Sequence, residues 1–115
     1  DRPLLTTGSV TLTHGGTADL ENNGSAQDIR WNATGTALEV AGANFIVLIP
    51  NTTYDNVHYD ALSPAIINQT SIPVGSLFAG AVVGVITTDG RRGAIRVDGG
   101  VASGGSITIT YRVYQ

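Results

Sequence analysis

Residues 19–24 of this chain, Asp-Leu-Glu-Asn-Asn-Gly, place oxygen-bearing side chains at alternating positions, as the opening of a calcium loop does. Asp19, Glu21 and Asn23 would be the ligands, and Gly24 would permit the sharp turn around the cation. The twelfth position holds Arg30, where a calcium loop has a bidentate Glu. Two interpretations therefore remain, a calcium-like loop and an ordinary acidic turn. The sequence indicates no cofactor.

A second group, Asp55-x-x-His58-x-Asp60, contains the residue types of an acid–base pair or of a metal site. In an extended strand, side chains 55 and 58 point to opposite faces, whereas 58 and 60 share one. His58 and Asp60 are then better explained as a hydrogen-bonded surface pair. No Ser lies in the G-x-S-x-G context of a hydrolase. We predict that the chain is not an enzyme, and a hydrolase using these three residues is a minor alternative.

Aromatic residues beside Asp and Asn could bind a carbohydrate, because a ring stacks on the apolar face of a sugar while its neighbours reach the hydroxyl groups. Trp31, Tyr54 and Tyr59, together with Asp55, are the residues to which we assign this role. The competing interpretation places Trp31 in the core and scatters the tyrosines over the surface. A carbohydrate-binding module with a glycan as its partner is therefore the alternative function.

The chain contains four N-x-S/T sequons, at Asn23, Asn32, Asn51 and Asn68. If the source organism glycosylates its proteins, these residues would lie in solvent-facing loops of a secreted glycoprotein. If it does not, they are turns rich in Asn.

Residues 61–88 form a stretch of 28 residues without an ionisable side chain. Only 13% of the chain is charged, about half the roughly 25% that is usual for globular proteins. All six basic residues are Arg, and the chain contains no Lys. Lys is common on exposed edge strands, where its charge hinders pairing with another chain. We therefore expect this stretch to be buried in the core or against a partner, and we expect strand edges that are covered or used.

Apolar and polar residues alternate with period two, and no segment of helical period has useful length. The run at 44–49, FIVLI preceded by Asn, predicts a central strand buried on both faces and ended by Pro50. Asp89-Gly90 matches a type I′ turn within a hairpin over 79–97. In the last strand, Ile107, Ile109, Tyr111 and Val113 are expected to face inward, with Thr108, Thr110, Arg112 and Tyr114 facing outward. Further strands are predicted at 8–13, 28–31, 37–41 and 57–59.

These strands predict an all-β fold, an antiparallel β-sandwich, with a small β-barrel or a jelly-roll as the alternative. The chain is long enough for one domain, which we place at 8–115, preceded by an N-terminal arm at 1–7.

Two strings share the pattern G-S-β-T-aliphatic-T, at Gly8–Thr13 and at Gly105–Thr110. One interpretation is convergence, because Thr suits the exposed face of a strand. In the other, the two strands occupy equivalent edges, and the N-terminal strand of one subunit pairs with the C-terminal edge of its neighbour.

The net charge of −3 argues against a nucleic acid as partner. No apolar run approaches the length of about 18 residues that a membrane span needs, so we predict none. We expect a non-catalytic structural module on an extracellular, cell or virion surface. It would self-assemble through strand edges and uncharged apolar surface into a homo-oligomer, a polymer or a filament.

Overall fold

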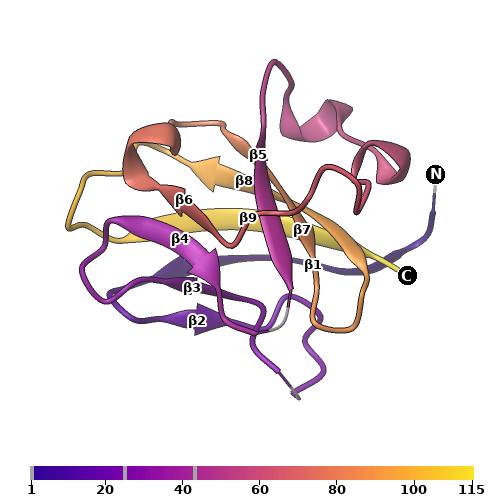
Figure 1. Ribbon diagram of the computed structural model, residues 1–115, viewed down its shortest axis with the longest axis horizontal. Helices are drawn as coiled ribbons and strands as arrows, with labels where there is room; N and C mark the ends of the chain where they lie inside the picture. The colour runs from indigo at the N-terminus through magenta and orange to yellow at the C-terminus, as the bar shows by residue number, and fades with distance from the viewer. Residues whose placement is uncertain (1, 25, 43) are drawn as a thin grey trace.

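The computed structural model describes residues 2–24, 26–42 and 44–115, and within these ranges it shows two antiparallel sheets (Figure 1). The larger sheet has the order β1-β9-β8-β7-β5, with β1 at Leu4–Leu12, β5 at Phe45–Ile49, β7 at Val82–Ile86, β8 at Arg92–Asp98 and β9 at Ile107–Tyr114. The smaller has the order β2-β3-β4-β6, with β2 at Thr17–Ala18, β3 at Ile29–Trp31, β4 at Ala37–Val40 and β6 at Ser71–Pro73. The prediction of an all-β fold of antiparallel strands is confirmed.

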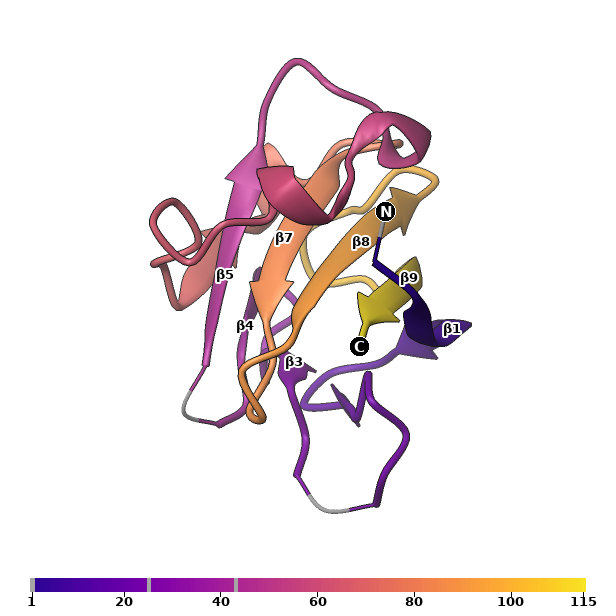
Figure 2. The same cartoon turned by 90° about the vertical axis from the view of Figure 1, so that its right-hand side faces the viewer.

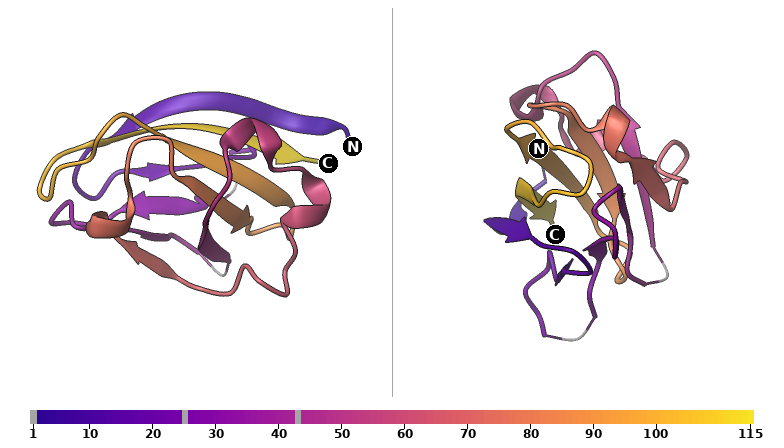
Figure 3. Two further views of the ribbon diagram at one scale, coloured as in Figure 1. Left: turned by 90° about the horizontal axis from the view of Figure 1, so that it is seen from above. Right: turned by 90° about the vertical axis from the view of Figure 1, so that its left-hand side faces the viewer.

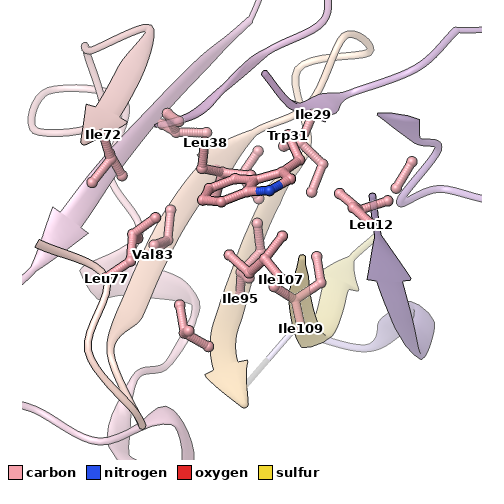
Figure 4. Packing of buried hydrophobic residues seen from close by; sticks show 14 of the residues in the cluster. Leu12, Ile29, Trp31, Leu38, Ile72, Leu77, Val83, Ile95, Ile107 and Ile109 are labelled. Atoms are coloured by element: carbon pink, nitrogen blue, oxygen red, sulfur yellow. The ribbon is translucent and has the colours of Figure 1, made fainter. Parts of the chain in front are cut away.

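The two sheets face each other across a shared apolar core (Figure 4). Leu12, Val83 and Ile95 enter it from the larger sheet, and Trp31 and Leu38 enter it from the smaller. Trp31 is completely buried, and its indole Nε1 donates to the carbonyl oxygen of Gly105 at 2.7 Å. Burial of these side chains is the main force that holds the layers together.

A second apolar cluster, which we call the outer cluster, lies on the outer face of the larger sheet. Its buried members are Val57, Leu62, Ile67, Val82, Ala94 and Tyr114. Two single-turn 3₁₀ helices, η1 at Tyr54–Asn56 and η2 at Tyr59–Ala61, cross β7 and β8 there (Figure 2). Around them Val57, Leu62 and Ile67 pack against side chains that β7, β8 and β9 turn outward. Both faces of β7 are therefore covered, which explains its uncharged sequence.

Gly84 in β7 marks a close approach of side chains from this second cluster. A Cβ atom there would lie 2.9 Å from Cδ1 of Ile67 and 3.1 Å from Cδ1 of Ile49. Only glycine leaves room for the two isoleucines at these distances. A third 3₁₀ turn, η3 at Val74–Ser76, follows β6.

Two strand predictions are wrong. Phe45–Ile49 forms the last strand of the larger sheet rather than a central one, and Phe45 is exposed. Its apolar sequence reflects the outer cluster, which covers the face that would otherwise be wet. Residues 57–59 form no strand, because η1 and η2 occupy this region and Val57 is held between them.

The hairpin between β7 and β8 is confirmed, but its turn is not of type I′. The amide of Gly90 donates to the Thr87 carbonyl oxygen at 2.9 Å, and the amide of Thr87 donates to the Arg91 carbonyl oxygen at 2.8 Å. Gly90 has a φ of 83°, whereas Asp89 is not among the described non-glycine residues with positive φ. The connection is therefore a three-residue loop, a turn followed by a left-handed glycine.

The two similar strings are neighbours in space, because β1 and β9 pair antiparallel. Val10 lies opposite Ile109, and Thr11 lies opposite Thr108, with 2.8 Å between their Oγ1 atoms. β9 lies between β1 and β8 and is therefore no edge. Residues 4–7, which we expected in an arm, continue β1 along the chain's own β9, and Asp1 lies outside the described residues.

The outward face of β9 departs from the prediction at its end. Tyr114 points to the expected side but is buried there, because the outer cluster covers it. Near it the amide of Gln115 donates to the carbonyl oxygen of Pro3 at 2.9 Å, which brings the start of β1 and the end of β9 together.

The uncharged stretch 61–88 is only partly buried. Ten of its 28 residues are buried, mostly in and around β7, whereas 13 are exposed, all of them within 61–80. Its first part contains Ser, Asn, Gln, Thr, Pro and Gly, which are neutral but suit water-facing turns. The expectation of complete shielding is therefore wrong for residues 61–80 and right for the β7 arm.

Candidate functional site

The acidic turn at 19–24 is closed by its own backbone. The Asp19 carboxylate accepts hydrogen bonds from the amides of Glu21, Asn23 and Gly24 at 3.2, 3.1 and 2.8 Å. Glu21 is turned inward, with 4% of its surface exposed, and its Oε2 lies 2.6 Å from Nη1 of Arg91. The expected calcium ligands are therefore engaged elsewhere. No group of three or more His, Cys, Asp or Glu side chains suited to a metal occurs in the described part of the chain.

Burial raises the pKa of Glu21, more than the hydrogen bond from Arg91 lowers it, and the charges of Asp28 and Asp89 raise it further. The second carboxylate oxygen of Glu21 is buried without a hydrogen-bond partner. This carboxylate is therefore costly to ionise in the folded protein.

Trp31 cannot take part in a carbohydrate site in this fold. Its ring belongs to the core between the sheets and has no exposed surface, so no ligand can stack on it. This assignment is wrong, and the competing interpretation of a core tryptophan is correct. Tyr54, Asp55 and Tyr59, by contrast, are brought together on η1 and η2.

The rings of Tyr54 and Tyr59 are occupied by guanidinium groups. Arg112 lies 4.1 Å and Arg96 5.3 Å from the ring centre of Tyr54. Arg92 lies 4.3 Å and Arg2 4.8 Å from that of Tyr59. We call these six residues with Tyr114 the arginine–tyrosine cluster. Each partly desolvated contact of this type contributes about 0.5–2 kcal/mol.

Arg112 ties the two turns to β9. Its Nη2 atom donates to the carbonyl oxygens of Tyr54, at 2.7 Å, and of Val57. Its Nε atom donates to the Tyr114 hydroxyl at 2.9 Å. No carboxylate in the described residues forms an ion pair with Arg112, so neutral oxygens and rings surround its charge.

A cavity of about 340 Å³ opens beside this cluster. It lies between the start of β1, the two 3₁₀ turns and the end of β9, and its lining is Arg2, Leu4, Asp55, His58, Arg112 and Tyr114. The structure thus brings Asp55 and His58 to one cavity, whereas Asp60 is exposed and does not line it.

The sequence analysis names Tyr54 and Tyr59 of this cluster, but it does not identify the arginines or Tyr114 as their partners. Arg112 and Tyr114 were placed on the outward face of the last strand, but nothing local indicated what would cover them. The one available signal was their spacing of two residues on the face opposite Ile109 and Val113.

The second candidate site is the free edge of β1. Within the described ranges, no backbone hydrogen bond joins residues 4–12 to any segment other than β9. The strand has nine residues and no charged side chain, and Leu4 and Leu5 are 46% and 40% exposed. Figure 3 shows β1 along the rim of the molecule, beside β9.

The other sheet edges are protected. In β5, Ile46 exchanges backbone hydrogen bonds of 2.8 and 3.0 Å with Gln69, which covers part of that edge. In the smaller sheet β2 has two residues, and β6 has three and ends in Pro73. Short strands and proline are common protections against edge pairing. Among the described edge strands, β1 is the longest and has no charged side chain. Its register shifts between Leu4 and Thr6, and the Thr6 hydroxyl donates to the Leu20 carbonyl oxygen at 2.6 Å, whereas its backbone edge has no partner strand in the described ranges.

Three of the four sequon asparagines, Asn23, Asn51 and Asn68, are exposed. Asn32 is half-buried, and its side chain bonds to Thr36 on both sides, with Nδ2 donating at 3.0 Å and Oδ1 accepting at 2.8 Å. The sequon at Asn23 ends at Ser25, which lies outside the described residues.

No protein-family model, no curated protein and no solved structure matches the chain significantly, so its own geometry is the basis for a function. Among the described residues, no helix has the length and apolar character that crossing a membrane requires.

Proposed function

We propose that this chain is a non-catalytic structural domain that self-assembles by pairing its β1 edge with the β1 edge of a second copy. The observation that carries the proposal is the contrast between β1 and the other edges. An edge strand of nine residues without a charge presents a row of amide and carbonyl groups ready to pair. Selection against aggregation would shorten or charge such an edge unless it were used.

An antiparallel pair of β1 strands extends the larger sheet across a two-fold axis. The internal pairing of β1 supports this geometry, because β9 carries the same G-S-β-T-aliphatic-T string and runs antiparallel to β1. When the β1 strand of a second copy pairs with the free edge, β1 has strands of the same sequence pattern on both sides, β9 on one and the second β1 on the other.

Leu4 and Leu5 supply apolar surface to the same contact. Both are exposed on a single copy, and their burial contributes about 25 cal/mol for each Å² removed from water. A two-fold contact uses the same patch twice, so each such side chain counts on both copies. A setting outside the cell or on a virion fits this proposal, since Asn23, Asn51 and Asn68 are exposed to potential glycosylation.

Sedimentation velocity over a wide concentration range tests the proposal. The natural chain should shift from monomer to dimer as its concentration rises. Leu5→Lys places a charge on the exposed edge and should hold the chain as a monomer. Ala33→Lys adds the same charge in an exposed turn between β3 and β4 and should leave the dimer intact. A natural chain that stays monomeric throughout, or equal effects of the two lysines, would contradict the proposal.

A further inference from the structure

We infer that the cavity beside the arginine–tyrosine cluster binds a small sugar acid, a ligand with one carboxylate and several hydroxyl groups. The polar groups of this site, on Arg112, Tyr114 and Asp55, lie outside β1, although Leu4 of β1 also lines the cavity. It lies between three parts of the chain that are far apart in sequence, and its volume of about 340 Å³ is at the lower end of the range of roughly 300–1,000 Å³ found for ligand sites.

Arg112 provides the anchor for the carboxylate. Its Nε and Nη2 atoms are used by the Tyr114 hydroxyl and by two carbonyl oxygens, which fix the plane of the guanidinium. The remaining nitrogen, Nη1, has no protein acceptor among the described residues, although Arg112 lines the cavity. A guanidinium held in this way is pre-organised for a carboxylate, because little side-chain freedom is lost on binding.

Tyr114 provides a second donor. Its hydroxyl oxygen accepts from Nε of Arg112 and donates to no acceptor in the described part of the protein. The hydroxyl proton is therefore available to an acceptor on the ligand. The ring is fixed by an edge-to-face contact with Tyr59, with 5.7 Å between the ring centres.

The charges of the lining select a monoanion with hydroxyl groups. The lining contains the guanidinium groups of Arg2 and Arg112, which suit a carboxylate, beside the Asp55 carboxylate, which suits hydroxyl groups. The exposed Asp55 carboxylate accepts hydrogen bonds and would repel a phosphate dianion, whereas it can bind sugar hydroxyls. Leu4 adds an apolar patch for the carbon face of a pyranose ring.

Isothermal titration calorimetry with glucuronate, glucose, acetate and inorganic phosphate tests this inference. Glucuronate should bind tightest, because only it carries both the carboxylate and the hydroxyl groups. Equal affinity for glucose would exclude recognition of the carboxylate. Equal affinity for acetate or phosphate would exclude recognition of the sugar. Absence of heat with glucuronate at millimolar concentration would overturn the inference altogether.

Variants locate the site. Tyr114→Phe keeps the ring and removes the hydroxyl, and Asp55→Asn changes only an exposed side chain; each should weaken glucuronate binding about threefold to tenfold. Arg112→Lys should weaken it at least about tenfold. Arg30→Gln is the matched control, because Arg30 pairs with Glu39 at 2.7 Å outside the cavity lining, and its affinity should be unchanged. Thermal unfolding of each variant identifies any loss of fold, and unchanged affinity in folded Tyr114→Phe and Asp55→Asn would contradict the site.

Discussion

Arg112 of β9 lies 4.1 Å from the centre of the Tyr54 ring and donates a hydrogen bond of 2.7 Å to the carbonyl oxygen of that same residue. One side chain thus holds both the ring and the backbone of η1 against the larger sheet. This contact makes the outer cluster part of the fold rather than a loose loop, and it also shapes the cavity.

Arg112→Ala should destabilise the protein by roughly 2–4 kcal/mol, because it removes hydrogen bonds from a charged donor and a cation–π contact. Guanidinium chloride unfolding measures the change. Arg30→Ala serves as control and should cost at most about 1 kcal/mol, since its pair with Glu39 is on the surface. Equal losses in the two variants would show that Arg112 does not hold the turns.

Trp31 should behave as a core residue in solution. It is the only tryptophan of the chain, so native fluorescence reports on it alone, and emission should be blue-shifted and resistant to acrylamide. Trp31→Ala should destabilise the fold by about 3–5 kcal/mol. Emission that responds to added sugars or is quenched freely would contradict its burial.

Glu21 should make the protein lose stability as pH rises through the range where it ionises. Its folded-state pKa lies above its ordinary value, chiefly because burial penalises the charged form. The contribution to stability is therefore complete below the unfolded pKa and is lost as pH passes the folded one. Relative to the natural chain, Glu21→Gln should gain stability as pH rises above the ordinary pKa range of a Glu, about 4, as measured by urea unfolding.

Asp98 should show the opposite sign and so serves as the control for Glu21. Burial raises the pKa of Asp98, but the hydrogen bonds from Thr110 and Arg96 outweigh burial and lower it overall. Its contribution is present above the unfolded pKa and is lost as pH falls through the folded one. Asp98→Asn should therefore remove part of the acid sensitivity, and equal pH profiles for both variants would contradict these assignments.

Gly84→Ala should destabilise the protein by about 1–3 kcal/mol, because the new methyl group collides with Cδ1 of Ile67. Ile67→Val removes that Cδ1 atom, so the double variant should recover part of the loss. Gly100→Ala is the control, since no atom lies within 4 Å of its added Cβ. Thermal unfolding compares five chains, which are the natural chain, Gly84→Ala, Ile67→Val, the double variant and Gly100→Ala. Additive losses in the double variant would exclude this collision.

The sequence predicted the strands whose pattern is local. Ile107, Ile109 and Val113 are buried as their alternation indicates, and the hairpin around Gly90 forms where turn residues separate two strand-forming arms. It did not predict which strand would lie at an edge. An apolar run such as 45–49 is expected both in a central strand and in an edge strand whose outer face is buried by a loop segment. Here residues near Val57 and Ile67 bury that face.

The candidate sites depend on contacts between distant residues, which local patterns do not contain. The β-formers around Val57 predict a strand, but η1 and η2 form there. Arg112 donates to the carbonyl oxygen of Val57, between the two turns, from a position 55 residues away. The free edge of β1 depends equally on the sheet order, since the similar strings indicated a relationship without showing that they pair with each other.

Amide hydrogen exchange of β1 at low and at high protein concentration tests most directly whether this edge joins two copies. The amides of residues 4–12 that point away from β9 should exchange quickly in dilute solution and become protected as concentration rises, while those of Val82–Ile86 stay protected throughout. Exchange at β1 that is the same at every concentration would contradict assembly through this strand.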